Sequence, residues 1–260
     1  MILAACSGSE LASAVNDGAV VPGEVVVVDA GAEPRQQLRY DISDQTLNRV
    51  IETTTSLESR FGGEGTQIDP TTSAAAVEVT TRRDGDEFFV TLGALTADSG
   101  GGQDLDGSFD TRGLALTGSL NDRSTDPIVE LLGAGVLRIR PLPEDEVGVG
   151  AIWHVDLVHD EVDADFVTRT TLTLREFTDG GAILDVAVEQ FVETGALIPI
   201  GDEQWSVAEW DATATGFVDV RFDQYLPVDW QITATANQVL EFGDVIAELG
   251  NTSISSPDEG

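Results

Sequence analysis

Alternation of apolar and polar residues is the dominant pattern of the chain, and it is clearest over residues 228–242. One parity is apolar and the other polar: Val228, Trp230, Ile232, Ala234, Ala236, Leu240 and Phe242 against Asp229, Gln231, Thr233, Thr235, Asn237 and Glu241. A period of two residues is that of a β-strand with one buried face. The preceding segment, 212–222, alternates in the same way and predicts a neighbouring strand.

Two Asp-Gly pairs predict tight hairpins. Asp84-Gly85 separates strand-like segments at 76–83 and 87–95, and Asp179-Gly180 lies between strand-like segments at 165–177 and 182–191. An Asp-Gly pair permits the positive backbone angles that a type I′ turn requires. The chain therefore reads as a series of antiparallel hairpins.

Other segments give weaker signals. Four valines at 25–28 predict a short first strand, and 36–59 reads as two extended segments around Ser43-Asp44. A helix at 47–57 is the alternative, but β-branched residues favour the extended form. One helix is predicted near 125–132, where Thr125-Asp126-Pro127 supplies a capping residue and an early proline.

These elements predict a mainly β protein, made either of antiparallel curved sheets or of an open barrel. Two similar β-meander units are expected at 24–122 and 144–245, with a short helical connector at 123–143. The last segment, 246–260, is expected to be a polar tail because its final ten residues are mostly polar.

The charge of the chain restricts its partners. It contains 47 acidic residues against 13 basic ones, all arginine, for a formal net charge of −34. Nucleic acid and anionic membrane surfaces are therefore disfavoured as direct partners, since both need clustered positive charge. The charge also suggests a further hypothesis, a salt-adapted protein that needs dissolved salt to screen the repulsion between its own carboxylates.

The only cysteine, Cys6, lies at the end of the sequence Leu3-Ala4-Ala5-Cys6. This sequence resembles the lipobox of bacterial lipoproteins, in which the cysteine receives a diacylglyceryl group and becomes the first residue. The resemblance implies an extracytoplasmic protein anchored to the cell membrane by lipid on Cys6. Residues 1–5 would be the end of a signal peptide, incomplete because it lacks a basic segment and an apolar run of about 7–15 residues. Residues 6–23 would be a flexible tether.

The alternative is a cytosolic chain with an incidental cysteine. A single cysteine excludes an intrachain disulfide, so stability has to come from a buried core. No internal run approaches the roughly 20 apolar residues of a membrane-spanning helix. The phrase at 141–153, PLPEDEVGVGAIW, also resembles one found in uncharacterised bacterial envelope lipoproteins, a likeness that implies no activity.

No catalytic or metal-binding constellation is evident. His154 and His159 are five residues apart, which places them on opposite faces of a strand, whereas zinc needs three or four convergent ligands. The acidic loop near Asp104, Asp106 and Asp110 lacks the spacing of a calcium-binding loop. The glycines at 100–102 are not followed by the residues of a phosphate-binding loop, and no nucleophile elbow occurs. The sequence therefore predicts a protein that is not an enzyme and uses no metal or cofactor.

Aromatic residues give the one positive indication of a site. The four tryptophans fall in the second unit, and with Phe242 they either fill the core or line a cavity for an apolar ligand: Trp153, Trp205, Trp210 and Trp230. The leading hypothesis is a non-enzymatic, lipid-anchored envelope protein that holds an amphipathic or lipid-like ligand on a concave β surface. The alternative is a structural or protein-interaction module with a filled core.

Overall fold

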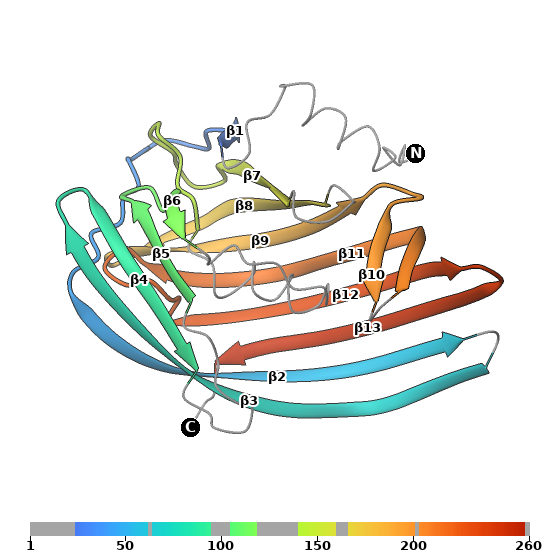
Figure 1. The fold of residues 1–260 in the computed structure, drawn as a ribbon. Helices are drawn as coiled ribbons and strands as arrows, with labels where there is room; N and C mark the ends of the chain where they lie inside the picture. Colours follow the sequence, from blue (N-terminus) through green and yellow to red (C-terminus); the bar gives the residue numbers. More distant parts are fainter. Residues whose placement is uncertain are drawn as a thin grey trace.

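One large antiparallel sheet makes up the described part of the chain (Figure 1). The computed structural model describes residues 24–61, 64–94, 105–118, 140–159, 166–200 and 203–257. It confirms a mainly β fold: within these residues there are thirteen strands and no helix. The helix expected within 123–143 falls largely on residues outside these ranges. No helix of the described part is long and apolar enough to cross a membrane.

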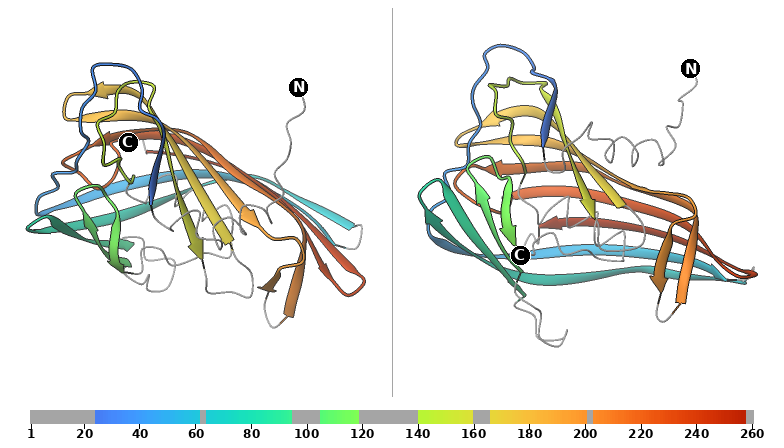
Figure 2. Two further views of the ribbon diagram at one scale, coloured as in Figure 1. Left: turned by 90° about the horizontal axis from the view of Figure 1, so that it is seen from above. Right: turned by 45° about the horizontal axis from the view of Figure 1, so that its top comes forward.

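The strands follow one another mostly by hairpins. Their bounds are β1 Val25–Asp29, β2 Gln45–Phe61, β3 Glu64–Asp84, β4 Glu87–Ala94, β5 Leu105–Asp110, β6 Ala115–Gly118, β7 Ile152–His159, β8 Phe166–Thr178, β9 Gly181–Val192, β10 Leu197–Ile200, β11 Glu203–Arg221, β12 Asp229–Phe242 and β13 Val245–Pro257. Their order in the sheet is β1-β7-β8-β9-β11-β12-β13-β2-β3-β4-β5-β6, and β10 pairs with the start of β11. The sheet is strongly bent, as the views in Figure 2 show.

The alternation of apolar and polar residues in β12 predicts a strand with one buried face, and the structure has such a face. Trp230, Ile232 and Ala234 are at most 1% exposed, whereas Asp229 and Gln231 lie on the opposite, solvent-facing side. We call the side of the sheet that carries Trp230 the inner face and the other side the outer face. Phe242 departs from the pattern, since it has inner-face parity but is 40% exposed.

Two sequence-based expectations about secondary structure need correction. The helix alternative at 47–57 is wrong, because these residues lie in the middle of strand β2. The polar tail is wrong for residues 246–257, which belong to β13 and pair on both sides, with β12 and with β2. Polar side chains such as Ser253 and Ser255 misled the prediction, because they lie on the inner face of a central strand.

The turns also differ from type I′. Gly85 has φ of +65° and Gly180 has φ of +75°, but no described residue other than glycine has a positive φ. Neither Asp86 nor Asp179 therefore adopts the left-handed conformation that a type I′ turn needs at both central positions. In the first hairpin the central pair is Gly85-Asp86, one residue later than expected, with glycine first, as in a type II′ turn.

The main core lies at the end of the sheet that contains the β3–β4, β8–β9 and β11–β12 turns, which we call the closed end. Three connecting segments fold against the inner face there, 36–42, 140–151 and 222–228. They contribute buried side chains to one cluster with Trp153 and Trp230: Leu38, Tyr40, Ile42, Leu142, Val147, Tyr225 and Leu226. Burial raises the pKa of the Tyr40 hydroxyl, which donates to the Arg140 carbonyl at 3.1 Å.

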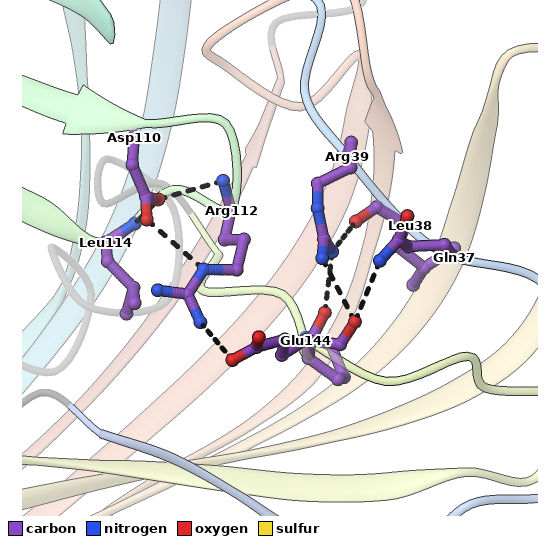
Figure 3. Close-up of polar contacts among 8 residues, drawn as sticks. Gln37, Leu38, Arg39, Asp110, Arg112, Leu114 and Glu144 are labelled. Atoms are coloured by element: carbon purple, nitrogen blue, oxygen red, sulfur yellow. Dashed lines mark hydrogen bonds and ion pairs between the residues drawn. The ribbon is translucent and has the colours of Figure 1, made fainter. Parts of the chain in front are cut away.

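Arg39 links two of these segments, 36–42 and 140–151, by hydrogen bonds (Figure 3). Its guanidinium donates to the carbonyl oxygens of Leu38 at 2.5 Å, Pro143 at 2.8 Å and Glu144 at 3.0 Å. The Glu144 carboxylate in turn lies 3.3 Å from Arg112, which also pairs with Asp110 at 3.2 Å. Charged donors thus satisfy carbonyl groups that no strand pairs.

We predict that Arg39→Ala lowers the free energy of unfolding by about 1–3 kcal/mol, because three carbonyl groups lose a charged donor. Chemical denaturation measures this loss. Arg82→Ala is the control, since Arg82 is exposed and only stacks over the Phe89 ring, 4.8 Å from its centroid; its cost should be about 1 kcal/mol at most. Equal losses for the two variants would contradict the role given to Arg39.

Candidate ligand-binding face

The inner face changes character along the strands. Its middle carries short side chains on β11, β12 and β13: Ala212, Ala214, Gly216, Ala234, Ala236, Ser253 and Ser255. Apart from the glycine, each is at most 1% exposed. Short side chains leave space above a sheet, since packed layers lie about 10 Å apart. Neighbouring groups therefore have to cover this part of the inner face.

A second apolar cluster lies at the opposite end, which contains the β2–β3 and β12–β13 turns and which we call the open end. Its buried members come from five strands: Val192, Ile198, Trp205, Val207, Leu240 and Ala247. The rings of Trp205 and Phe242 lie 5.5 Å apart. Phe242 and Val245, which pair with each other across the β12–β13 hairpin, are 40% and 42% exposed at the same end. Apolar surface is thus accessible at this end of the inner face.

Polar side chains lie between the two clusters on the inner face. Gln190 on β9 and Gln238 on β12 are 5% and 7% exposed. Trp210 packs against both clusters and donates from Nε1 to Gln190 Oε1 at 3.2 Å. Gln238 faces Trp210 across the β11–β12 pair. Two glutamines therefore interrupt the apolar inner face between the two clusters.

Two buried polar atoms on this face have no hydrogen-bond partner within the described residues. One is Trp205 Nε1, a donor in a side chain that is only 8% exposed, and the other is Asn251 Oδ1, an acceptor. Asn251 pairs with Ala236, six positions along β12 from Phe242, so the two atoms lie on the order of 20 Å apart. Leaving such an atom unpaired costs about 1–3 kcal/mol.

The structure separates the aromatic residues that the sequence singled out. Trp153 and Trp230 belong to the main core, where their indole groups donate to Pro141 O at 2.8 Å and Ser255 Oγ at 3.4 Å. Trp205 and Phe242 come together at the open end, with Trp210 beside them. Cys6 lies outside the described residues.

The histidines do not converge with other ligands in the described part of the chain. His154 on β7 lies opposite Val26 of β1 and Thr171 of β8, and His159 is the last residue of β7. Burial lowers the pKa of His154, with a further contribution from the Arg169 charge and an opposing one from Asp156. The fully buried Asp156 is held by Arg169 through contacts of 2.7 and 2.5 Å, so its charge is matched. Among the described residues, no three metal-ligating side chains form a group.

A hollow of about 260 Å³ on the outer face was not expected. It surrounds Gly250, and its charged lining comes from Glu58, Arg60, Glu209 and Glu248. Arg60 lies 2.8 Å from Glu58 and 3.6 Å from Glu248. The hollow exists because glycine places no side chain between Asn237 and Glu58, a juxtaposition of three strands that the sequence does not reveal.

The polar inner-face residues were missed as well, although one of them left a signal. Gln238 has the parity of the buried residues of 228–242, and a glutamine at a buried position predicts either a buried hydrogen bond or a ligand contact. Gln190 and Asn251 left no comparable signal. Their significance depends on strands that pair only in the folded sheet.

Substituting phenylalanine for two tryptophans should separate a paired indole from an unpaired one. We expect Trp153→Phe to lower the free energy of unfolding by about 1 kcal/mol more than Trp205→Phe, because only Trp153 loses a hydrogen bond. Urea denaturation of the two variants measures the difference. A larger loss for Trp205→Phe would show that its indole N–H has a partner in the unliganded protein.

Comparison of the chain with protein-family models and with curated proteins found no match in either case. A functional proposal therefore depends on the residues of the inner face and on the sequence around Cys6.

Proposed function

We propose that the protein is a non-enzymatic, lipid-anchored component of the bacterial cell envelope that holds an amphipathic or lipid-like ligand at the open end of its inner face. The observation that carries this proposal is the unpaired indole N–H of Trp205 within an apolar cluster beside the exposed ring of Phe242. A ligand with an apolar chain and an acceptor atom would cover the ring and pair the N–H.

The polar residues further along the inner face suit the same ligand class. Gln238 and Asn251 offer amide groups toward the middle of the sheet, roughly 13 Å and 20 Å respectively along the strands from the level of Phe242. An extended amphipathic molecule placed along the strands would contact apolar side chains at one end and amides at the other. No residue is assigned a catalytic role in this proposal.

The membrane anchor is the second part of the proposal. Acylation of Cys6 would hold the acidic body outside the cell membrane, with residues 6–23 as a tether, and no nucleic-acid contact is involved. We also propose that the sheet consists of two related meanders joined by a helical connector at 123–143. The strand order supports this, because β2 to β6 and β7 to β13 each run mainly through neighbouring hairpins.

A structural or protein-interaction module is the second candidate. The near-complete burial of Ala234, Ala236 and Ser253 favours it, because a face already covered by polypeptide has no room for a ligand there. The two candidates differ at the open end. Ligand binding requires an accessible apolar surface around Phe242, whereas the module requires none.

Binding of a fluorescent fatty acid, cis-parinaric acid, tests the site. We expect Phe242→Ser to weaken binding about tenfold, since the ligand would cover the exposed part of this ring and a factor of ten corresponds to about 1.4 kcal/mol. Ile246→Ser should leave the affinity unchanged. Ile246 is also exposed in this hairpin but pairs with Glu241, so it lies on the outer face. No saturable binding to the unsubstituted protein, or equal losses in the two variants, would favour the module.

Expression with the natural upstream sequence tests the anchor. Mass spectrometry should find a diacylglyceryl group on Cys6, and the protein should fractionate with membranes. Cys6→Ala should move it to the soluble fraction, because a covalent lipid contributes about 0.8 kcal/mol for each buried methylene group. An unmodified Cys6 would remove the anchor but would leave the fatty-acid experiment as a separate test of the inner face.

A further inference from the structure

The two unpaired polar atoms of the inner face differ in what they need from a ligand. Trp205 Nε1 is a hydrogen-bond donor at the open end, whereas Asn251 Oδ1 is an acceptor in the middle of the sheet. The first atom needs an acceptor and the second needs a donor. Because they lie on the order of 20 Å apart along the strands, one ligand satisfies both only if it has a polar group at each end.

An accessible route between these atoms follows β13 and β2. Leu249 on β13 and Leu57 on β2 share the inner face with Asn251, and all three are only partly buried. Leu249 also packs against the cluster of the open end. On β12, by contrast, Ala236 is 1% exposed at the level of Asn251. An extended chain that starts at Trp205 can therefore reach Asn251 over Leu249, outside the covered part of the face.

The strands that form this route direct no charged side chain toward it. Between the level of Phe242 and that of Asn251, the inner-face residues of β12, β13 and β2 are all uncharged. On β2, the basic residue Arg49 shares the inner face, but it is eight positions from Leu57, roughly 26 Å along the strand. A carboxylate or phosphate buried beside Asn251 would have no charged partner, which is strongly unfavourable.

We propose that the ligand is a bipolar amphiphile, with an oxygen atom that accepts from Trp205 at one end and an uncharged hydroxyl that donates to Asn251 at the other. This inference rests on the function proposed above. A hydroxyl both donates and accepts, so it can pair with the oxygen or the nitrogen of the Asn251 amide. The apolar middle of the molecule covers Leu249 and the Phe242 ring. A lipid with a single polar end leaves Asn251 Oδ1 unpaired and is disfavoured.

Displacement of cis-parinaric acid from the full 260-residue chain by palmitic acid and by ω-hydroxypalmitic acid tests the second polar end. At neutral pH we expect the hydroxy acid to bind about fivefold more tightly, the effect of one additional hydrogen bond. ω-Methoxypalmitic acid keeps the oxygen but cannot donate, so it should lose this advantage. Hexadecanedioic acid, whose second end is charged, should bind at least about tenfold more weakly than the hydroxy acid.

Two matched variants identify the partner of the hydroxyl. Asn251→Leu keeps the size of the side chain but removes the amide, so the preference for the hydroxy acid should disappear or reverse. Asn237→Leu makes the same change on the outer face of neighbouring β12 and should retain the preference. Trp205→Phe should weaken the binding of both acids and leave their ratio unchanged, because both lose the same hydrogen bond.

The outcomes separate this inference from the function on which it rests. Equal affinities for palmitic and ω-hydroxypalmitic acid, or a preference that persists in folded Asn251→Leu, would overturn the bipolar ligand and leave lipid binding intact. No binding of cis-parinaric acid or of any of these acids would overturn the proposed function itself. If circular dichroism shows that Asn251→Leu does not fold, the comparison of the hydroxy and methoxy acids on the unsubstituted chain decides, and equal affinities for those two would overturn the inference.

Discussion

Backbone pairing between β13 and β2 is the interaction on which the rest of the structure depends. It runs from Ala247 opposite Phe61 to Pro257 opposite Ile51, and it joins the beginning of the described chain to its end. The Thr55 and Ser253 hydroxyls, 198 positions apart, lie 2.6 Å from each other across it. Without this pairing there would be two smaller sheets, each with a further open edge. Contacts of such sequence separation also carry a large loop-closure cost, so they are expected to form late in folding.

The joined sheet separates two kinds of apolar surface. At the closed end, the connecting segments cover the inner face, and Arg39 and Arg112 satisfy their carbonyl and carboxylate groups. At the open end, the strands extend past these segments, so Phe242 and its neighbours remain accessible. The buried glutamines lie between the two regions. This arrangement gives the inner face a gradient from a packed core to an exposed apolar cluster.

The acidic composition acts on the outer surface rather than on the core. Buried charges in the described residues are few, and the Asp156–Arg169 pair shows how one is accommodated, with two contacts to a single guanidinium. The other carboxylates of the described residues are exposed or partly exposed, and their charge keeps molecules of this protein apart.

The sequence by itself determined which segments are strands, and the tertiary structure determined which strands pair and which side chains come together. Alternation in 228–242 correctly predicted β12 and its buried face, because side-chain direction in a strand depends only on position. The prediction failed for 246–257, where Ser253 and Ser255 are buried by strands almost 200 residues away. Likewise, the sequence identified Trp153, Trp205, Trp210 and Trp230 as a set, but only sheet pairing placed Trp205 beside Phe242 and Trp153 in the core. The local sequence specifies the backbone conformation of a strand and which side chains share a face. Burial and the composition of a site depend on the register between distant strands, which no single strand encodes.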